Sequence, residues 1–165
     1  MFKLLPIAAL GLIGAILCSP QTAQQRDAQF RAKFAKESDP LHKAQLMPQF
    51  GSLEFQDAED ALDQDNLAKA AETVKEYRDQ VRSCARELDA KVTDPEKHPA
   101  GFKQLQISLR QALRRLDDII HALPADDQKP FLEVRKDLDD LDRHLVRELF
   151  PRQPDAAPPP VNPKS

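Results

Sequence analysis

"LAKAAETVKEYRDQVRSCAREL", residues 67–88, carries apolar or small side chains at alternating steps of three and four positions. That spacing lines them up along one side of an α-helix, which has about 3.6 residues per turn. Charged and polar residues fill the positions between them, so the stretch predicts a long amphipathic helix with one buried side. The buried stripe comprises Leu67, Ala70, Val74, Tyr77, Val81, Cys84 and Leu88.

Similar stripes lie on both sides of this helix. We predict a short polar helix over residues 24–36, anchored by Phe30 and Phe34, and a longer helix over residues 41–62. The longer helix is expected to bend near Pro48, because the proline ring removes a backbone donor. Two more amphipathic helices follow. Their stripes are Phe102, Leu105, Leu109, Ala112, Leu116, Ile119 and Leu123, and then Phe131, Val134, Leu138, Leu141, Leu145 and Leu149.

Turn and cap residues separate the helices. "SDP" at residues 38–40 offers a helix cap, with Ser38 as a candidate, and a first-turn proline. "DQDN" at residues 63–66 interrupts the next helix, and a proline-containing connection follows at residues 93–101. Asp126 and Asp127 are candidate caps for the last helix.

Composition agrees with a helical fold. The chain of 165 residues has only 4 glycines and 5% aromatic residues, while 31% of its residues are charged. Short connections between long helices favour antiparallel neighbours. We therefore predict an all-α fold, an antiparallel up-and-down bundle of about four long helices plus a short N-terminal helix, in a single domain over residues 24–150.

The N-terminus is typical of an export signal. Lys3 precedes an unbroken apolar stretch over residues 4–17, which is shorter than the roughly 20 residues of a membrane span. We expect residues 1–23 to form a cleavable secretory signal segment cut after Ala23, which implies an extracytoplasmic location, periplasmic or secreted. The alternative is a lipoprotein leader that ends before Cys18, with lipidation of Cys18; Leu17 departs from that pattern, which has a small residue there.

The C-terminus predicts a disordered tail. Residues 151–165, "PRQPDAAPPPVNPKS", are rich in proline and almost free of bulky apolar side chains. Such a segment cannot bury enough surface to order itself.

Cysteine usage and charge narrow the function classes. With the leader removed or Cys18 lipidated, Cys84 is the remaining thiol and no disulfide is expected; on its buried stripe we expect it to be inert. The net charge is −3 at pH 7, without the basic excess that nucleic-acid binding requires. Nucleic acid is therefore not an expected partner.

Two Asp/His pairs have the spacing of helix-borne metal ligands. Asp118 stands three residues before His121, and Asp140 stands four residues before His144. Both pairs lie beside the apolar stripes, whereas a metal site inside a bundle needs inward-facing ligands, so we expect a solvated face and no internal metal. A surface site that combines His121 and His144 stays open as an alternative.

One helix also carries an excess of positive charge. Lys103, Arg110, Arg114 and Arg115 precede its first acidic residue, Asp117. The patch either pairs with the acidic last helix or holds an anionic partner, such as a lipid headgroup.

No catalytic motif stands out. The sequence has no "CxxCH", no Gly-rich phosphate loop and no "GxSxG". We predict a non-enzymatic, exported helical-bundle protein without a cofactor, which serves as a protein-binding or scaffold module of the cell envelope. We expect its partner to be an envelope protein, whose identity the sequence does not give. Contact with a membrane is expected only through the leader or a lipid on Cys18. Self-association into a homo-oligomer is a further alternative. The alternative is a small-ligand or metal-ion carrier with a surface site near His121 and His144.

Overall fold

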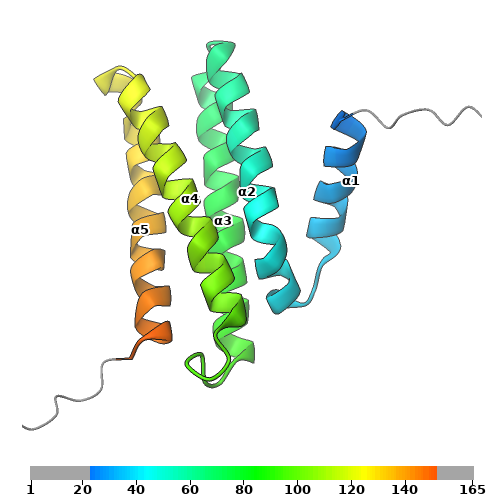
Figure 1. The fold of residues 1–165 in the computed structure, drawn as a ribbon. Helices are drawn as coiled ribbons and strands as arrows, with labels where there is room; N and C mark the ends of the chain where they lie inside the picture. The colour runs from blue at the N-terminus through cyan, green and yellow to red at the C-terminus, as the bar shows by residue number, and fades with distance from the viewer. Residues whose placement is uncertain (1–22, 152–165) are drawn as a thin grey trace, which may run out of the picture.

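The structure, a computed structural model, describes residues 23–151. The expected signal segment up to residue 22, with Cys18, and the tail beyond Pro151 lie outside the described residues. The described chain forms α1 (Ala23–Lys36), α2 (Pro40–Asp63), α3 (Leu67–Lys91), α4 (Ala100–Ala122), the short 3-10 helix η1 (Ala125–Asp127) and α5 (Lys129–Leu149) (Figure 1). No strand occurs in this part of the chain, so the all-helical prediction is confirmed.

The predicted stripes form the core. Every member of the α3 stripe is buried except Leu67, which is half-buried against the core at the start of the helix. The stripes of α4 and α5 are buried in the same way, with half-buried Leu123 and Leu141 at their margins. The largest fully buried side chains include Tyr77, Phe55, Phe102, Phe131 and Met47.

The helices form two antiparallel hairpins, α2 with α3 and α4 with α5 (Figure 1). Between the hairpins, α2 packs mainly on α4 and α3 on α5. Gly101 and Leu41 meet near the starts of α4 and α2, and Arg115 bonds to Glu59 near the ends of both helices. The start of α2 therefore lies beside the start of α4, and the end of α2 lies beside the end of α4, so the two helices run parallel.

The same holds for α3 and α5. Arg78 donates to Asp137 in the first half of each helix, and Asp89 pairs with His144 toward their ends. Consecutive helices from α2 to α5 therefore alternate in direction as predicted, whereas the main contacts between the hairpins, α2 with α4 and α3 with α5, join parallel helices, which the sequence did not predict. An apolar stripe determines which side of a helix is buried, but it leaves open which helix covers that side.

Helix starts depart from the expected caps. Pro40 begins α2 as predicted, but the carboxylate of Asp39 makes no capping bond and accepts from Lys91 instead. The Asp39 N–H donates to the side chain of Glu37 at 2.9 Å, so Glu37 and not Ser38 satisfies this backbone donor. Asp126 and Asp127 lie in η1, where neither side chain caps a helix.

The N-terminal helix α1 lies at one edge, beside α2 (Figure 1). Its anchor Phe34 is buried, and its ring stacks on that of Phe50 with 4.1 Å between centroids and 4° between planes. Phe30 is half-buried, with its ring 6.4 Å from that of Phe34. Most other side chains of α1 are exposed, so α1 is the least embedded of the five α-helices described.

Candidate functional site

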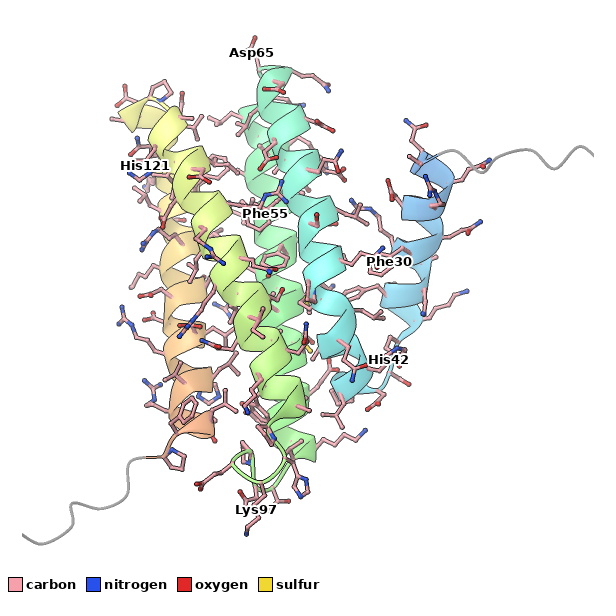
Figure 2. All side chains as sticks on the ribbon, in the orientation of Figure 1. Phe30, His42, Phe55, Asp65, Lys97 and His121 are labelled. Carbon is pink, nitrogen blue, oxygen red and sulfur yellow. The ribbon has the colours of Figure 1, made fainter. Side chains whose placement is uncertain are left out.

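The two histidines singled out by the sequence lie far apart. His121 is exposed at the end of α4, and its Nδ1 lies 2.6 Å from the backbone oxygen of Asp117 (Figure 2). His144 is near the other end of the α4–α5 hairpin, because Asp142, two residues before it, accepts from Gln106 early in α4. The fifteen positions from Gln106 to His121 correspond to roughly 20 Å along a helix at about 1.5 Å per residue. A shared site at His121 and His144 has no geometric basis in this arrangement.

The carboxylates predicted beside these histidines do not build a metal centre either. Asp118 is exposed, and Asp140 lies 3.8 Å from Arg143. The imidazole of His144 pairs with Asp89 of α3 at 2.9 Å. Residues 23–151 contain no group of three or more His, Cys, Asp or Glu side chains arranged to hold a metal ion.

The basic patch of α4 divides between two neighbours. Arg115 turns to α2, where it donates to both carboxylate oxygens of Glu59 and to the backbone oxygen of Ser52. Arg110 turns to α5, with its Nε 3.8 Å from Asp142. The interpretation that the patch pairs with the last helix therefore fits Arg110 alone. Lys103 and Arg114 are exposed and have no ion pair or hydrogen bond within the described part of the chain.

A groove of about 520 Å³ borders α1, α2 and α3, which we call the α1 groove. Phe34 and Phe50 form its apolar wall, and its acidic wall includes Glu54 of α2, Glu76 and Asp79 of α3. Glu54 is only 3% exposed, and its carboxylate forms an ion pair with Arg31 of α1. Arg31 also reaches Asp57 at 2.6 Å.

Sequence reasoning missed Glu54. An uncompensated buried carboxylate is costly, so the sequence pattern favours a solvated position for any glutamate. One feature of the sequence could have indicated that Glu54 is buried: it lies four residues after Phe50, on the side of α2 that faces Phe34.

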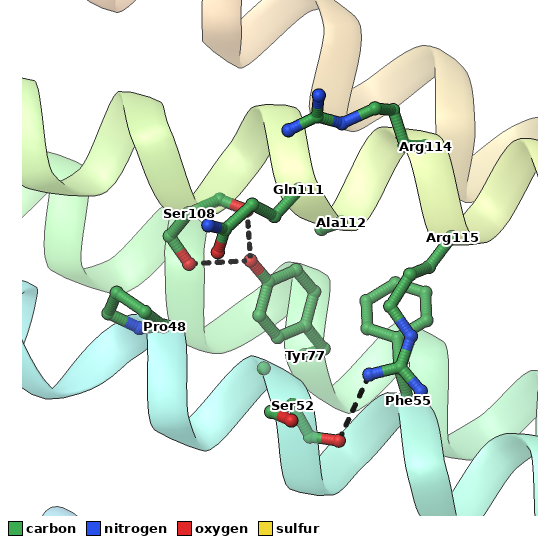
Figure 3. A pocket seen from close by; sticks show the side chains of 10 residues that line it. Pro48, Ser52, Phe55, Tyr77, Ser108, Gln111, Ala112, Arg114 and Arg115 are labelled. Carbon is green, nitrogen blue, oxygen red and sulfur yellow. Dashed lines mark hydrogen bonds between the residues drawn. The ribbon is translucent and has the colours of Figure 1, made fainter.

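A second hollow lies between α2 and α4, with a volume of about 340 Å³ (Figure 3). We call it the α2–α4 cleft. Small residues from both helices surround it, and the ring of Tyr77 from α3 forms its floor. Its lining comprises Pro48, Gly51, Ser52, Phe55, Tyr77, Ser108, Gln111, Ala112, Arg114 and Arg115.

Tyr77 supplies the polar group at the floor of this cleft. Its hydroxyl lies 3.2 Å from Oγ of Ser108 and donates to the backbone oxygen of Ser108 at 3.5 Å, and the two dashed lines at this hydroxyl in Figure 3 mark these bonds. Burial raises the pKa of Tyr77 above its usual range, so the phenol stays protonated and acts as a neutral donor or acceptor. The cleft therefore has an apolar floor with one hydroxyl pair.

The cysteine on the core stripe has no reactive character. Cys84 is fully buried, and burial raises the pKa of its thiol to about 12. Its predicted burial is confirmed, and a buried thiol with a raised pKa is expected to be a poor nucleophile at physiological pH.

Within residues 23–151, no helix combines the length and apolar character that crossing a membrane demands. Comparison of the whole chain with protein-family models, curated proteins and solved structures finds no match.

Proposed function

We propose that this chain is an exported, non-enzymatic binding module of the cell envelope that holds an amphipathic helix of a partner protein against the α2 and α3 walls of the α1 groove, in the place of α1. One observation carries the proposal: the α2 wall of the groove already binds a helix, α1, which forms the opposite wall through a stacked aromatic ring and an ion pair with buried Glu54. Helix-in-groove binding uses such anchors one turn apart. The apolar leader over residues 4–17 supports export.

The chemistry of the groove specifies the kind of helix it accepts. Glu54 is buried next to α1 and pairs with Arg31, so a partner helix that takes the place of α1 and buries Glu54 again must supply a cation of its own. A suitable partner helix carries an arginine and an aromatic residue three positions later, as Arg31 and Phe34 do in α1. Glu76 and Asp79 add negative charge along the rim and favour a basic helix.

A synthetic peptide of residues 23–36 tests the groove directly. We expect the labelled peptide to bind a chain with the substitution Phe34→Ala, whose own α1 is loosened, more tightly than it binds the unaltered chain. A peptide with Arg31→Gln should bind less well, because it cannot pair with Glu54. Equal binding of a scrambled peptide, or no binding to the Phe34→Ala chain, contradicts the proposal. Fluorescence anisotropy measures all of these affinities.

Site-specific cross-linking tests for a partner. A photoreactive residue at Glu76, an exposed position of the groove, should capture an envelope protein, and excess peptide of residues 23–36 should reduce the yield. The same residue at Glu133, an exposed position of α5, is the matched control. Capture with equal yield at both positions, unaffected by the peptide, contradicts specific use of the groove.

Export is tested on the native protein. Mass spectrometry of its N-terminus should find Gln24, or a lipid-modified Cys18 if the lipoprotein alternative holds. A mature chain that retains residues 1–17 excludes both routes.

A further inference from the structure

We propose that the α2–α4 cleft is a binding site for a small amphipathic carboxylate, with its apolar part in the cleft and its carboxylate at Arg114. This site is separate from the α1 groove, because the two hollows lie on different sides of α2 and share no lining residue. Binding in the cleft can therefore occur whether or not the α1 groove binds a partner helix.

The cleft exists because both helices present small side chains at the same level. Gly51 and Ser52 of α2 face Ser108 and Ala112 of α4, while the bulky Phe55 comes one turn later. Pro48, a proline inside α2, also lines the cleft, and its ring cannot donate a backbone hydrogen bond to the preceding turn. At about 340 Å³ the cleft lies at the lower end of the roughly 300–1,000 Å³ range of small-molecule sites.

The lining suits an apolar ligand with few polar groups. The faces of Phe55 and Tyr77 and the side chains of Pro48 and Ala112 offer carbon surface. The hydroxyl groups of Tyr77 and Ser108 are already hydrogen-bonded to each other. An apolar ligand that covers them therefore leaves no polar group without a hydrogen-bond partner. A ligand rich in polar groups would lose hydration here without gaining partners.

Charge at the mouth selects an anion. Two guanidinium groups lie there, and Arg115 is already held by Glu59 and Ser52 and lies over the ring of Phe55. Arg114 has no protein partner within residues 23–151, and Figure 3 shows its side chain above the cleft, directed away from Tyr77. Because Arg114 is exposed and lines the cleft, a change of its rotamer can bring the guanidinium over the opening, where a carboxylate can accept from it.

The chain contains its own reporter for this site. Tyr77 is its single tyrosine, and it has no tryptophan. Intrinsic tyrosine fluorescence therefore reports on the floor of the cleft. Decanoate is a suitable probe, with decanol as the uncharged control, both below their aggregation concentrations. We expect a saturable fluorescence change with decanoate and weaker binding of decanol.

Two substitutions that each remove one positive charge from α4 distinguish binding in the cleft from a general attraction of anions to the helix. Arg114→Gln should weaken decanoate binding about threefold to tenfold, as expected for an ion pair at a partly solvated mouth. Lys103→Gln removes the same charge from the exposed side of the same helix, away from the cleft, and should leave the affinity unchanged. Ser52→Phe fills the opening and should abolish binding of both probes. Circular dichroism checks that each variant keeps its helical content.

Three results would overturn the inference. They are no fluorescence change with decanoate, equal affinity for decanoate and decanol, and equal affinity of the Arg114→Gln and unaltered chains.

Discussion

Tyr77 connects the parts of this molecule at the scale of a single residue. Its ring lies 6.4 Å from that of Phe50 and 5.3 Å, edge to face, from that of Phe55. Phe50 in turn stacks on Phe34 of α1. A continuous row of aromatic rings therefore runs from α1 through α2 to the floor of the α2–α4 cleft, and each such pair contributes about 0.5–1.5 kcal/mol beyond its buried area.

A side chain at Gly51 is expected to destabilise the fold. A Cβ at this position would lie 2.8 Å from Cε2 of Tyr77, whose ring is held between Phe50 and Phe55. Glycine to alanine inside a helix normally gains about 1 kcal/mol, but overpacking a core costs about 1–3 kcal/mol. We predict that Gly51→Ala lowers the free energy of unfolding by about 1 kcal/mol in urea titrations. Ser52→Ala, at the exposed neighbouring position, is the control and should be neutral or slightly stabilising; a more stable Gly51→Ala chain refutes the packing argument.

Cys84 should be unreactive in the folded protein. Burial raises the pKa of its thiol to about 12, so very little thiolate forms at pH 8, and the sulfur is also shielded from reagents in solution. In a Cys18→Ser chain, we predict that a thiol-specific reagent labels Cys84 at least a thousandfold more slowly in buffer than in concentrated urea. Comparable rates in the two solvents would show that the core around Cys84 opens readily.

At the scale of the helices, the sequence predicted the buried sides well and the helix starts poorly. The stripes of α3, α4 and α5 follow from spacing alone, because an apolar side chain at such a position is stabilised by burial whatever covers it. The bond from Asp39 N–H to Glu37 and the burial of Glu54 depend on residues that meet only after the chain has folded. The same limit applies to the α2–α4 cleft, which arises from small residues about sixty positions apart in the sequence.

The docking of α1 can be weakened without unfolding the other helices. Phe34 is buried on α2, but α1 has no other neighbour that it contacts extensively. We predict that Phe34→Ala speeds amide hydrogen exchange in residues 23–36 at least tenfold and leaves exchange in α3 and α4 nearly unchanged, because α1 opens as a local unit. Ala35→Gly, at an exposed position of α1, controls for the loss of helix propensity alone. Equal acceleration in all helices would mean that α1 belongs to the cooperative core.

Acid should loosen the segment that joins α1 to α2. The backbone N–H of Asp39 lowers the pKa of Glu37 from 4.5, and Lys91 lowers the pKa of Asp39 from 3.8. Carboxylates with a lowered pKa stabilise the folded state when ionised, so their contribution is present above about pH 4.5 and is lost as the pH falls through the folded-state values. We predict that NMR shifts of residues 36–42 change between pH 5 and pH 2.5. A Glu37→Gln, Asp39→Asn chain should lack this transition, and its persistence there would assign the change to other groups.

At the scale of the whole molecule, the arrangement of the two hairpins distinguishes this fold from a simple up-and-down bundle. Each hairpin is antiparallel because a short connection returns the chain, but α4 lies beside α2 in the same direction. The amphipathic pattern of α4 is satisfied by any apolar surface, so it cannot distinguish α2 from α3 as its main neighbour. The pairing of Arg115 with Glu59 and of Arg78 with Asp137 favours the parallel register, and neither pair has a local signature in the sequence.

Distances between spin labels can test this topology. Gln45 and Gln56 of α2, and Lys103 and Arg114 of α4, are exposed positions suited to labelling in a Cys18→Ser background, where Cys84 stays buried. In the parallel arrangement, the pairs Gln45/Lys103 and Gln56/Arg114 lie at matching levels. The pair Gln45/Arg114 should then be separated by roughly 16 Å more along the helix axes, from eleven residues at about 1.5 Å each. We predict two short distances for the matched pairs and a longer one for the crossed pair in double electron–electron resonance. An antiparallel α2–α4 contact reverses this order, with the crossed pair closer than at least one matched pair, and would remove the geometric basis of both the hairpin arrangement and the α2–α4 cleft.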